Sequence, residues 1–356
     1  MERELRLMKG NEAVAEAAIR AGVDGYFGYP ITPQSEIIEY LMEANPYERT
    51  GMVVLQAESE LAAINMVYGG AGCGKKVMTS SSSPGISLKQ EGITYIAGAE
   101  LPCLIVNVVR GGPGLGTIQP AQSDYFQAVK GGGHGDYHLI VLAPASVQEM
   151  ADFVELGFDL AFRYRNPVMI LSDGAIGQMM EKVWLNPQKE RSGTVPEWAT
   201  TGKPSTRERN VITSLELDPN RQELFNRKLV DKYNLIKAKE VRYEEFLCDD
   251  AEYLLVAYGT SARVCQKSVE LARRQGIRAG LIRPVTLYPF PSERINMLAD
   301  KAKMILAVEM SAGQMVEDVM LAVNGKTPVH FYGRMGGMVP TPDEVVDFLN
   351  NLISGS

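Results

Sequence analysis

The chain has 356 residues, of which 45% are hydrophobic and 22% charged, and its formal net charge is −7. This length favours two domains, and the scattered Lys and Arg of an acidic chain argue against nucleic-acid binding. No run approaches the roughly 18 apolar residues that a membrane helix needs, and the charged start has no apolar signal segment, so we expect a cytoplasmic protein without membrane attachment.

Residues 1–185 alternate between helical and strand patterns. Helices are expected at 12–21, 35–44, 59–68, 86–99 and 147–162. Strands are expected at 25–30, 52–56, 76–81, 101–110, 138–144 and 167–173. The run LPCLIVNVVR (101–110) is apolar throughout, as a strand of a parallel sheet covered on both faces requires. These repeated β-α-β units predict an α/β fold with a doubly wound parallel sheet.

The character of the chain changes after residue 185. Residues 186–250 are polar and rich in Pro and Gly at first, which predicts a linker followed by a charged helix around 219–246. Beyond them, three strands (251–260, 278–287, 303–310) alternate with two helices (262–276, 292–301). We therefore expect three regions: 1–185, 186–250 and 251–356, the last a smaller α/β domain.

Two features of the sequence argue against a P-loop and against a cysteine-ligated metal site. The segment GGAGCGKK (69–76) fits G-x-x-x-x-G-K, but Lys76 stands where a P-loop has Ser or Thr. A helix is expected before it and a strand after it, the reverse of a P-loop, so a glycine-rich turn is the better interpretation. The four cysteines (Cys73, Cys103, Cys248, Cys265) form no CxxC pair, so we expect no metal or iron–sulfur cluster on this chain.

Polar residues are expected where strands end. In YPITP, Pro33 favours extended geometry at Thr32 and places its hydroxyl at the carboxyl end of a strand, where open α/β sheets bind ligands. Glu58 and Glu60 stand where the next strand turns into a helix, whose N-terminus favours the anion while burial opposes it. Arg110 ends the apolar strand, where its guanidinium fork suits a substrate carboxylate. The alternative for Thr32 is a rigid turn. For Glu58 and Glu60 it is charge compensation at the helix N-terminus, and for Arg110 it is a surface salt bridge.

Two small-residue segments accompany these residues. They are SSSSPGISLKQEG (80–92) and VRGGPGLGT (109–117), both expected as loops at strand ends. Such loops let a ligand or a second subunit approach the backbone closely.

Long motifs resemble the alpha subunit of the 2-oxoacid:ferredoxin oxidoreductases. In this order and spacing they are YPITPQSE, QAESELAAINMVYGGAGCGKKVMTSSSSPG, QEGITYIAGAELPCLIVNVVRGGPGLGT, QSDYFQAVKGGGHGDYHLIVLAPASVQEM, VAYGTSAR and IRPVTLYPFP. The resemblance implies a pyrimidine-binding thiamine diphosphate domain followed by a transketolase-C-like domain.

The resemblance also implies roles for particular residues. In the family, the glutamate beside the coenzyme opens a helix that reaches a glycine nine residues later. Glu60 fits that spacing and would be the catalytic, cofactor-binding glutamate, with Glu58 in support. Thr32 and Arg110 would bind substrate. The remaining cofactor-binding positions would be Tyr29, Pro30 and Ile31.

The implied reaction is oxidative decarboxylation of a 2-oxoacid with coenzyme A and ferredoxin. The motifs favour the branched-chain (3-methyl-2-oxobutanoate) branch over the 2-oxoglutarate branch. The chain shows no acidic motif for Mg²⁺ and diphosphate and no cluster ligands. These would come from a beta subunit, a gamma subunit and a ferredoxin-like subunit, with the coenzyme between two chains. Another thiamine diphosphate enzyme, such as a transketolase, and a non-catalytic α/β module are the alternatives.

Overall fold

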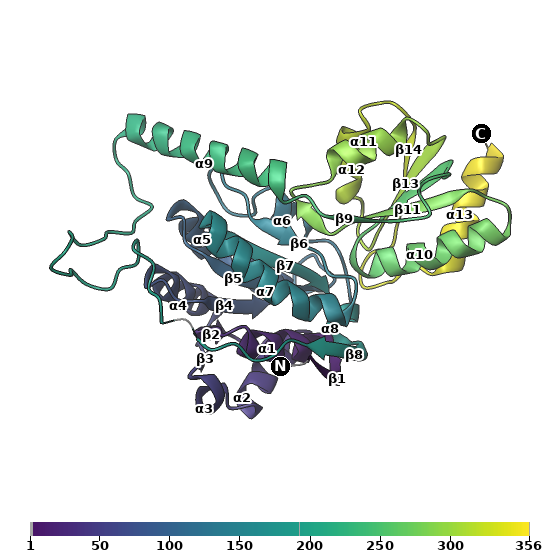
Figure 1. Ribbon diagram of the computed structural model, residues 1–356. Helices are drawn as coiled ribbons and strands as arrows, with labels where there is room; N and C mark the ends of the chain where they lie inside the picture. Colours follow the sequence, from purple (N-terminus) through teal and green to yellow (C-terminus); the bar gives the residue numbers. More distant parts are fainter. Residues whose placement is uncertain (1–2, 192, 356) are drawn as a thin grey trace.

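The computed structural model describes residues 3–191 and 193–355, whose two larger sheets lie side by side (Figure 1). The larger sheet has seven strands in the order β12-β6-β7-β5-β4-β2-β3. All are parallel except β12 at one edge, so the sheet has the doubly wound form that the sequence predicts. Its strands are β2 (Gly25–Gly28), β3 (Val53–Gln56), β4 (Val77–Ser81), β5 (Cys103–Val109), β6 (Ile140–Leu142), β7 (Pro167–Asp173) and β12 (Thr286–Tyr288).

Helices cover both faces of this sheet. They are α1 (Gly10–Arg20), α2 (Ser35–Glu43), α3 (Pro46–Thr50), α4 (Glu60–Gly72), α5 (Ser83–Gly98), α6 (Tyr125–Val129), α7 (Val147–Tyr164) and α8 (Gly174–Gln178). Helix α4 packs against α5, and α1 packs against α7. Because crossovers between parallel strands are right-handed, the two pairs lie on opposite faces. Strand β5 is buried along its whole length, as its apolar sequence predicts.

The smaller sheet has five strands in the order β14-β13-β10-β11-β9. They are β9 (Tyr243–Phe246), β10 (Tyr253–Val256), β11 (Ala279–Pro284), β13 (Met304–Glu309) and β14 (Val329–Gly333). Its helices are α10 (Gly259–Arg274), α11 (Ser292–Ala299), α12 (Met315–Val323) and α13 (Pro342–Gly355). Helix α9 (Pro219–Lys239) lies across the top of the view in Figure 1 and reaches toward this sheet. No helix within 3–191 and 193–355 is long and apolar enough to cross a membrane.

Several boundaries differ from the sequence prediction. The charged helix ends at Lys239 rather than near 246, because 243–246 pair antiparallel with β11. The expected strand 278–287 divides into β11 and β12, and β12 pairs with β6 of the larger sheet. Strands β1 (Glu4–Lys9) and β8 (Met180–Leu185) form an antiparallel ribbon that the sequence did not indicate. We keep the division into 1–185, 186–250 and 251–356 as a proposal.

Two helices of the larger unit are also longer than expected. Helix α4 continues through the glycine pair Gly69-Gly70, and α5 begins at Ser83, so most of the expected loop 80–92 is helical. The turn between α4 and β4 lies between a helix and a strand, as predicted for a segment that is not a P-loop.

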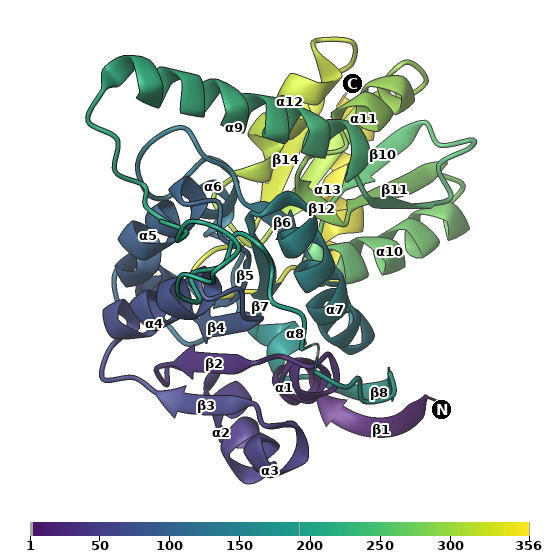
Figure 2. The same ribbon diagram turned by 60° about the vertical axis from the view of Figure 1, so that its left-hand side comes forward.

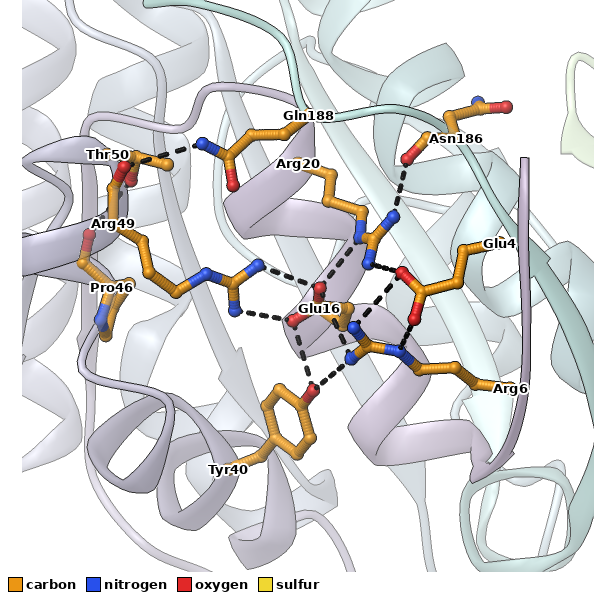
Figure 3. Close-up of polar contacts among 10 residues, drawn as sticks. All are labelled: Glu4, Arg6, Glu16, Arg20, Tyr40, Pro46, Arg49, Thr50, Asn186 and Gln188. Atoms are coloured by element: carbon orange, nitrogen blue, oxygen red, sulfur yellow. Dashed lines mark hydrogen bonds and ion pairs between the residues drawn. The ribbon is translucent and has the colours of Figure 1, made fainter. Parts of the chain in front are cut away.

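A buried ionic cluster connects α1 with α2 and α3 (Figure 3). Glu16 is fully buried and accepts hydrogen bonds from Arg20 and both terminal nitrogens of Arg49, at 2.7–2.9 Å. Tyr40 donates to the same carboxylate at 3.0 Å, and Arg6 lies 3.6 Å from it. A buried charge with this many partners fixes α1 against α2 and α3.

The two sheets are joined by buried hydrogen bonds. Gln122 donates to the carbonyl of Tyr258 at 2.8 Å and accepts from Ser261 Oγ at 2.7 Å. Asp173, at the end of β7, accepts from the backbone N–H and hydroxyl of Thr260 at 3.1 and 2.7 Å. These bonds hold the start of α10 over the carboxyl end of β7.

Candidate functional site

The segments that follow β2, β3, β4 and β5 meet at one edge of the larger sheet. Figure 2 shows β2 and β3 side by side with their arrowheads pointing the same way, and β4 and β5 continue the parallel order. The carboxyl ends of parallel strands share one edge, which is where open α/β sheets bind ligands. Residues 29–34, 57–60, 82–85 and 110–117 therefore belong to one region.

Glu60 is the first residue of α4 and is only 7% exposed. The helix start is fixed by Ser59, whose hydroxyl accepts a hydrogen bond from the N–H of Ala62 at 3.2 Å. Within residues 3–191 and 193–355, the Glu60 carboxylate has no hydrogen bond or ion-pair contact within 4 Å. Buried carboxylates are normally paired, so this group is available for a ligand.

Glu58 has a different environment. It is exposed, and its carboxylate accepts a hydrogen bond from Ser59 Oγ at 2.8 Å. The two glutamates thus differ in burial, and only Glu60 faces the interior of the edge region.

Gly85, on the first turn of α5, forms the wall opposite Glu60. A Cβ at this glycine would lie 2.8 Å from Glu60 Oε1 and 2.1 Å from Ser81 Oγ, so only glycine fits. The hydroxyls of Ser81 and Ser82 are buried without a hydrogen-bond partner in the described chain. Unsatisfied buried hydroxyls near an unpaired carboxylate make a polar cradle for a ligand that carries donors and acceptors.

The YPITP turn lies beside this cradle. Tyr29, Pro30 and Ile31 are half-buried, and Thr32 is exposed. The carbonyl of Pro33 accepts hydrogen bonds from the side-chain amides of Asn11 at 2.7 Å and Gln178 at 2.9 Å. These bonds anchor the turn to α1 and α8.

Arg110 and Thr32 are brought together. Arg110 Nη1 donates to the carbonyl of Thr32 at 3.0 Å, and Nη2 donates to the carbonyl of Leu115 at 3.1 Å. Its Nε is buried without a partner among the residues described. The guanidinium therefore holds the 111–117 loop against the YPITP turn, and its Nε–H remains available as a donor.

Sequence reasoning missed several residues of this region. Ser81, Ser82 and Gly85 were noted only as part of a small-residue loop, and their composition was the available signal. Lys89 gave no signal, because LKQEG resembles an ordinary polar helix face. Its burial depends on how α5 packs on β4.

Gly85→Ala should impair the site. The added methyl must push aside Ser81 Oγ and Glu60, and a displacement of about 1 Å at reacting groups lowers turnover by about 100-fold. The measurements are kcat and the Kd of the coenzyme that the sequence motifs imply, thiamine diphosphate. Gly72→Ala is the matched control, because its Cβ would meet only Thr200 Oγ1 at 3.8 Å. Equal behaviour of the two variants would contradict the assignment of Gly85 as the wall of the site.

No group of three or more His, Cys, Asp or Glu side chains suited to a metal ion occurs in the part of the chain that the structure describes. The four cysteines are free thiols, and Cys103 is buried in β5, within the apolar strand predicted at 101–110.

A doubly wound parallel sheet with a buried glutamate at its carboxyl edge, followed by a smaller α/β unit, is the arrangement expected of a thiamine diphosphate enzyme subunit, and the family models agree. Residues 16–240 match the family described as "Pyruvate flavodoxin/ferredoxin oxidoreductase, thiamine diP-bdg", and residues 251–345 match "Pyruvate:ferredoxin oxidoreductase core domain II". The chain belongs to the 2-oxoacid:ferredoxin oxidoreductase family, which confirms the resemblance inferred from its motifs.

The chain is similar to ketoisovalerate oxidoreductase subunit VorB of Methanothermobacter thermautotrophicus, with 51% identity and 99% of each chain covered. It is 37% identical to 2-oxoglutarate synthase subunit KorA of Methanothermobacter marburgensis, covering 96% of this chain and 97% of that one.

Among solved structures, it resembles 2-oxoglutarate:ferredoxin oxidoreductase from Magnetococcus marinus, with 2-oxoglutarate, coenzyme A and succinyl-CoA bound. The TM-score is 0.85 at 27% identity, covering 99% of this chain and 66% of that chain. A split-gene transketolase chain, at TM-score 0.61 and 13% identity with 98% of each chain covered, shares the fold. The predicted α/β class with a transketolase-like fold is confirmed.

Proposed function

We propose that this chain is the alpha subunit of an oxidoreductase that decarboxylates a branched-chain 2-oxoacid, 3-methyl-2-oxobutanoate, to its acyl-CoA with ferredoxin as electron acceptor. The observation that carries the proposal is Glu60: a buried carboxylate without a hydrogen-bond partner in the described chain, at the carboxyl edge of a sheet in this family. Bound thiamine diphosphate supplies an electron sink for the carbanion left when carbon dioxide departs.

Glu60 would hold or donate a proton at the aminopyrimidine ring of the coenzyme. The half-buried positions Tyr29, Pro30 and Ile31, with Glu58 nearby, would line the same edge. The free Nε donor of Arg110 supports its proposed role beside the substrate carboxylate, and the exposed Thr32 hydroxyl supports a substrate contact.

One observation favours the branched-chain substrate over 2-oxoglutarate. The VorB relative is 51% identical to this chain, whereas the KorA relative is 37% identical.

A partner chain would complete the site. Leu61, on the first turn of α4, is 51% exposed, and Leu88, on the second turn of α5, is 59% exposed. Apolar side chains beside a binding region are typical of subunit interfaces. We propose that a beta subunit covers this face and brings Mg²⁺ and the diphosphate site. A gamma subunit and a ferredoxin-like subunit would complete the assembly, with the iron–sulfur clusters on partner subunits, and the assembly would be cytoplasmic.

The substrate proposal is tested on the co-purified complex with 3-methyl-2-oxobutanoate, 2-oxoglutarate and pyruvate. With coenzyme A and a viologen acceptor, we expect kcat/KM for the branched-chain oxoacid to exceed that for each of the other two by about 10-fold or more, since one methylene gained or lost in a binding pocket changes kcat/KM by about that factor. A preference for 2-oxoglutarate would contradict the substrate choice and leave the family role intact.

A further inference from the structure

Lys89 is a fully buried lysine on α5, at 0% exposure. Its Nζ donates to Thr79 Oγ1 at 2.6 Å and to the carbonyl of Ser80 at 3.3 Å, both on β4. Lysine side chains are almost never fully buried unless a partner compensates the charge. The position therefore calls for an explanation beyond packing.

Glu60 is the carboxylate whose charge affects the pKa of Lys89. Burial lowers the pKa of the Lys89 ammonium to about 7, and the charge of Glu60 raises it again in part. The geometry agrees, because Gly85 lies one helical turn before Lys89 and its missing Cβ leaves room for Glu60 Oε1. Lys89 has no salt bridge within 4 Å in the described chain, so its charge is balanced through space rather than by a contact pair.

The residues that hold Lys89 also hold the YPITP turn. Ser80 Oγ accepts from Tyr26 OH at 2.7 Å and donates to Gln34 Oε1. Gln34 Nε2 in turn donates to the carbonyl of Tyr29 at 3.2 Å. A continuous buried polar network thus runs from Lys89 to the first residue of the turn. Such networks fix geometry when their members are satisfied.

We propose that Lys89 is a positioning residue for the thiamine diphosphate site: its ammonium, held by Thr79 and Ser80, sets the orientation of Glu60 toward the coenzyme ring. The proposal rests on the role assigned to Glu60. Lys89 touches neither coenzyme nor substrate, because its side chain is fully buried.

The test is Lys89→Met in the complete complex, which keeps the length of the side chain and removes the charge. We expect thiamine diphosphate still to bind. The near-ultraviolet circular dichroism of the bound coenzyme, which reports the protonation state of its aminopyrimidine ring, should change. We also expect kcat to fall by about 10-fold or more, as for loss of a group that supports proton transfer, with the oxoacid KM within about twofold of wild type.

Lys89→Arg, which retains a positive charge, should recover part of the wild-type spectrum. Lys75→Met, at an exposed lysine in the turn before β4, is the matched control and should behave as wild type. A Lys89→Met complex with the wild-type spectrum and turnover overturns the proposal.

If Lys89→Met does not fold, a second variant tests the same proposal. Thr79→Val removes only the hydroxyl that accepts from Lys89 and should shift the same dichroism in the same direction; an unchanged spectrum there also overturns the proposal. Glu60→Gln distinguishes failure of the role proposed for Glu60 from failure of the role proposed for Lys89. If Glu60→Gln turns over normally, the role of Glu60 fails; if it is inactive while both Lys89 variants resemble wild type, only the role of Lys89 fails.

Discussion

Glu60→Gln should abolish decarboxylation while the complex still assembles. The substitution keeps the shape of a side chain that lies at the first turn of α4, so the packing around Gly85 is retained. It removes the ionisable group, and loss of a positioned acid or base costs about 10²–10⁴-fold in rate. The measurements are viologen-linked turnover and the elution volume of the complex in size-exclusion chromatography.

Variants of two other glutamates serve as comparisons for Glu60→Gln. Glu43→Gln, at an exposed carboxylate on the last turn of α2, should leave turnover unchanged. Glu58→Gln should have a smaller effect than Glu60→Gln, because Glu58 is exposed and hydrogen-bonded to Ser59. Collapse in Glu58→Gln with normal turnover in Glu60→Gln would reverse the assignment.

Glu16→Ala should destabilise the larger unit by about 3–5 kcal/mol, the cost of removing one partner from a buried ionic cluster. The carboxylate is fully buried and is shared by Arg20, Arg49 and Tyr40 (Figure 3). Its loss leaves arginine charges without compensation at the α1–α3 contact. Denaturant unfolding of the purified complex, followed by far-ultraviolet circular dichroism, measures the change, and Glu43→Ala is the exposed control.

The same cluster predicts a pH dependence. Burial raises the pKa of the Glu16 carboxyl, but hydrogen bonds from Arg49 and Arg20 outweigh burial, so the pKa is lowered overall. A lowered folded-state pKa stabilises the protein above the unfolded value of about 4.3, and this contribution is lost as the pH falls through the folded pKa. The stability difference between wild type and Glu16→Ala should therefore shrink below about pH 4. A difference that is constant down to acid pH would contradict the ionic account.

The sequence predicted the βα order of the larger sheet because local patterns decide it. Strand β5 is an uninterrupted apolar run, and its burial along the whole length follows from composition alone. The YPITP prolines and the position of Thr32 at a strand end are also local. The family motifs distinguished Glu60 from Glu58 by spacing, and the burial of the two side chains is consistent with that distinction.

Other features were decided by packing between distant segments. Nothing in 278–287 indicates that β11 joins one sheet and β12 the other, because the choice depends on the open edge at β6. Glu16 and Lys89 have the sequence surroundings of surface residues, yet both are fully buried.

The sequence by itself thus determined the fold class, the family and the residue types at the carboxyl edge, since periodicity and strand-end chemistry are properties of neighbours along the chain. The tertiary structure alone decided which charges are buried and what faces them. Gly85 meets Glu60, and Lys89 lies behind it, only because α4 and α5 pack closely across residues more than twenty positions apart. Desolvation and charge compensation act through space, and sequence order does not encode them directly.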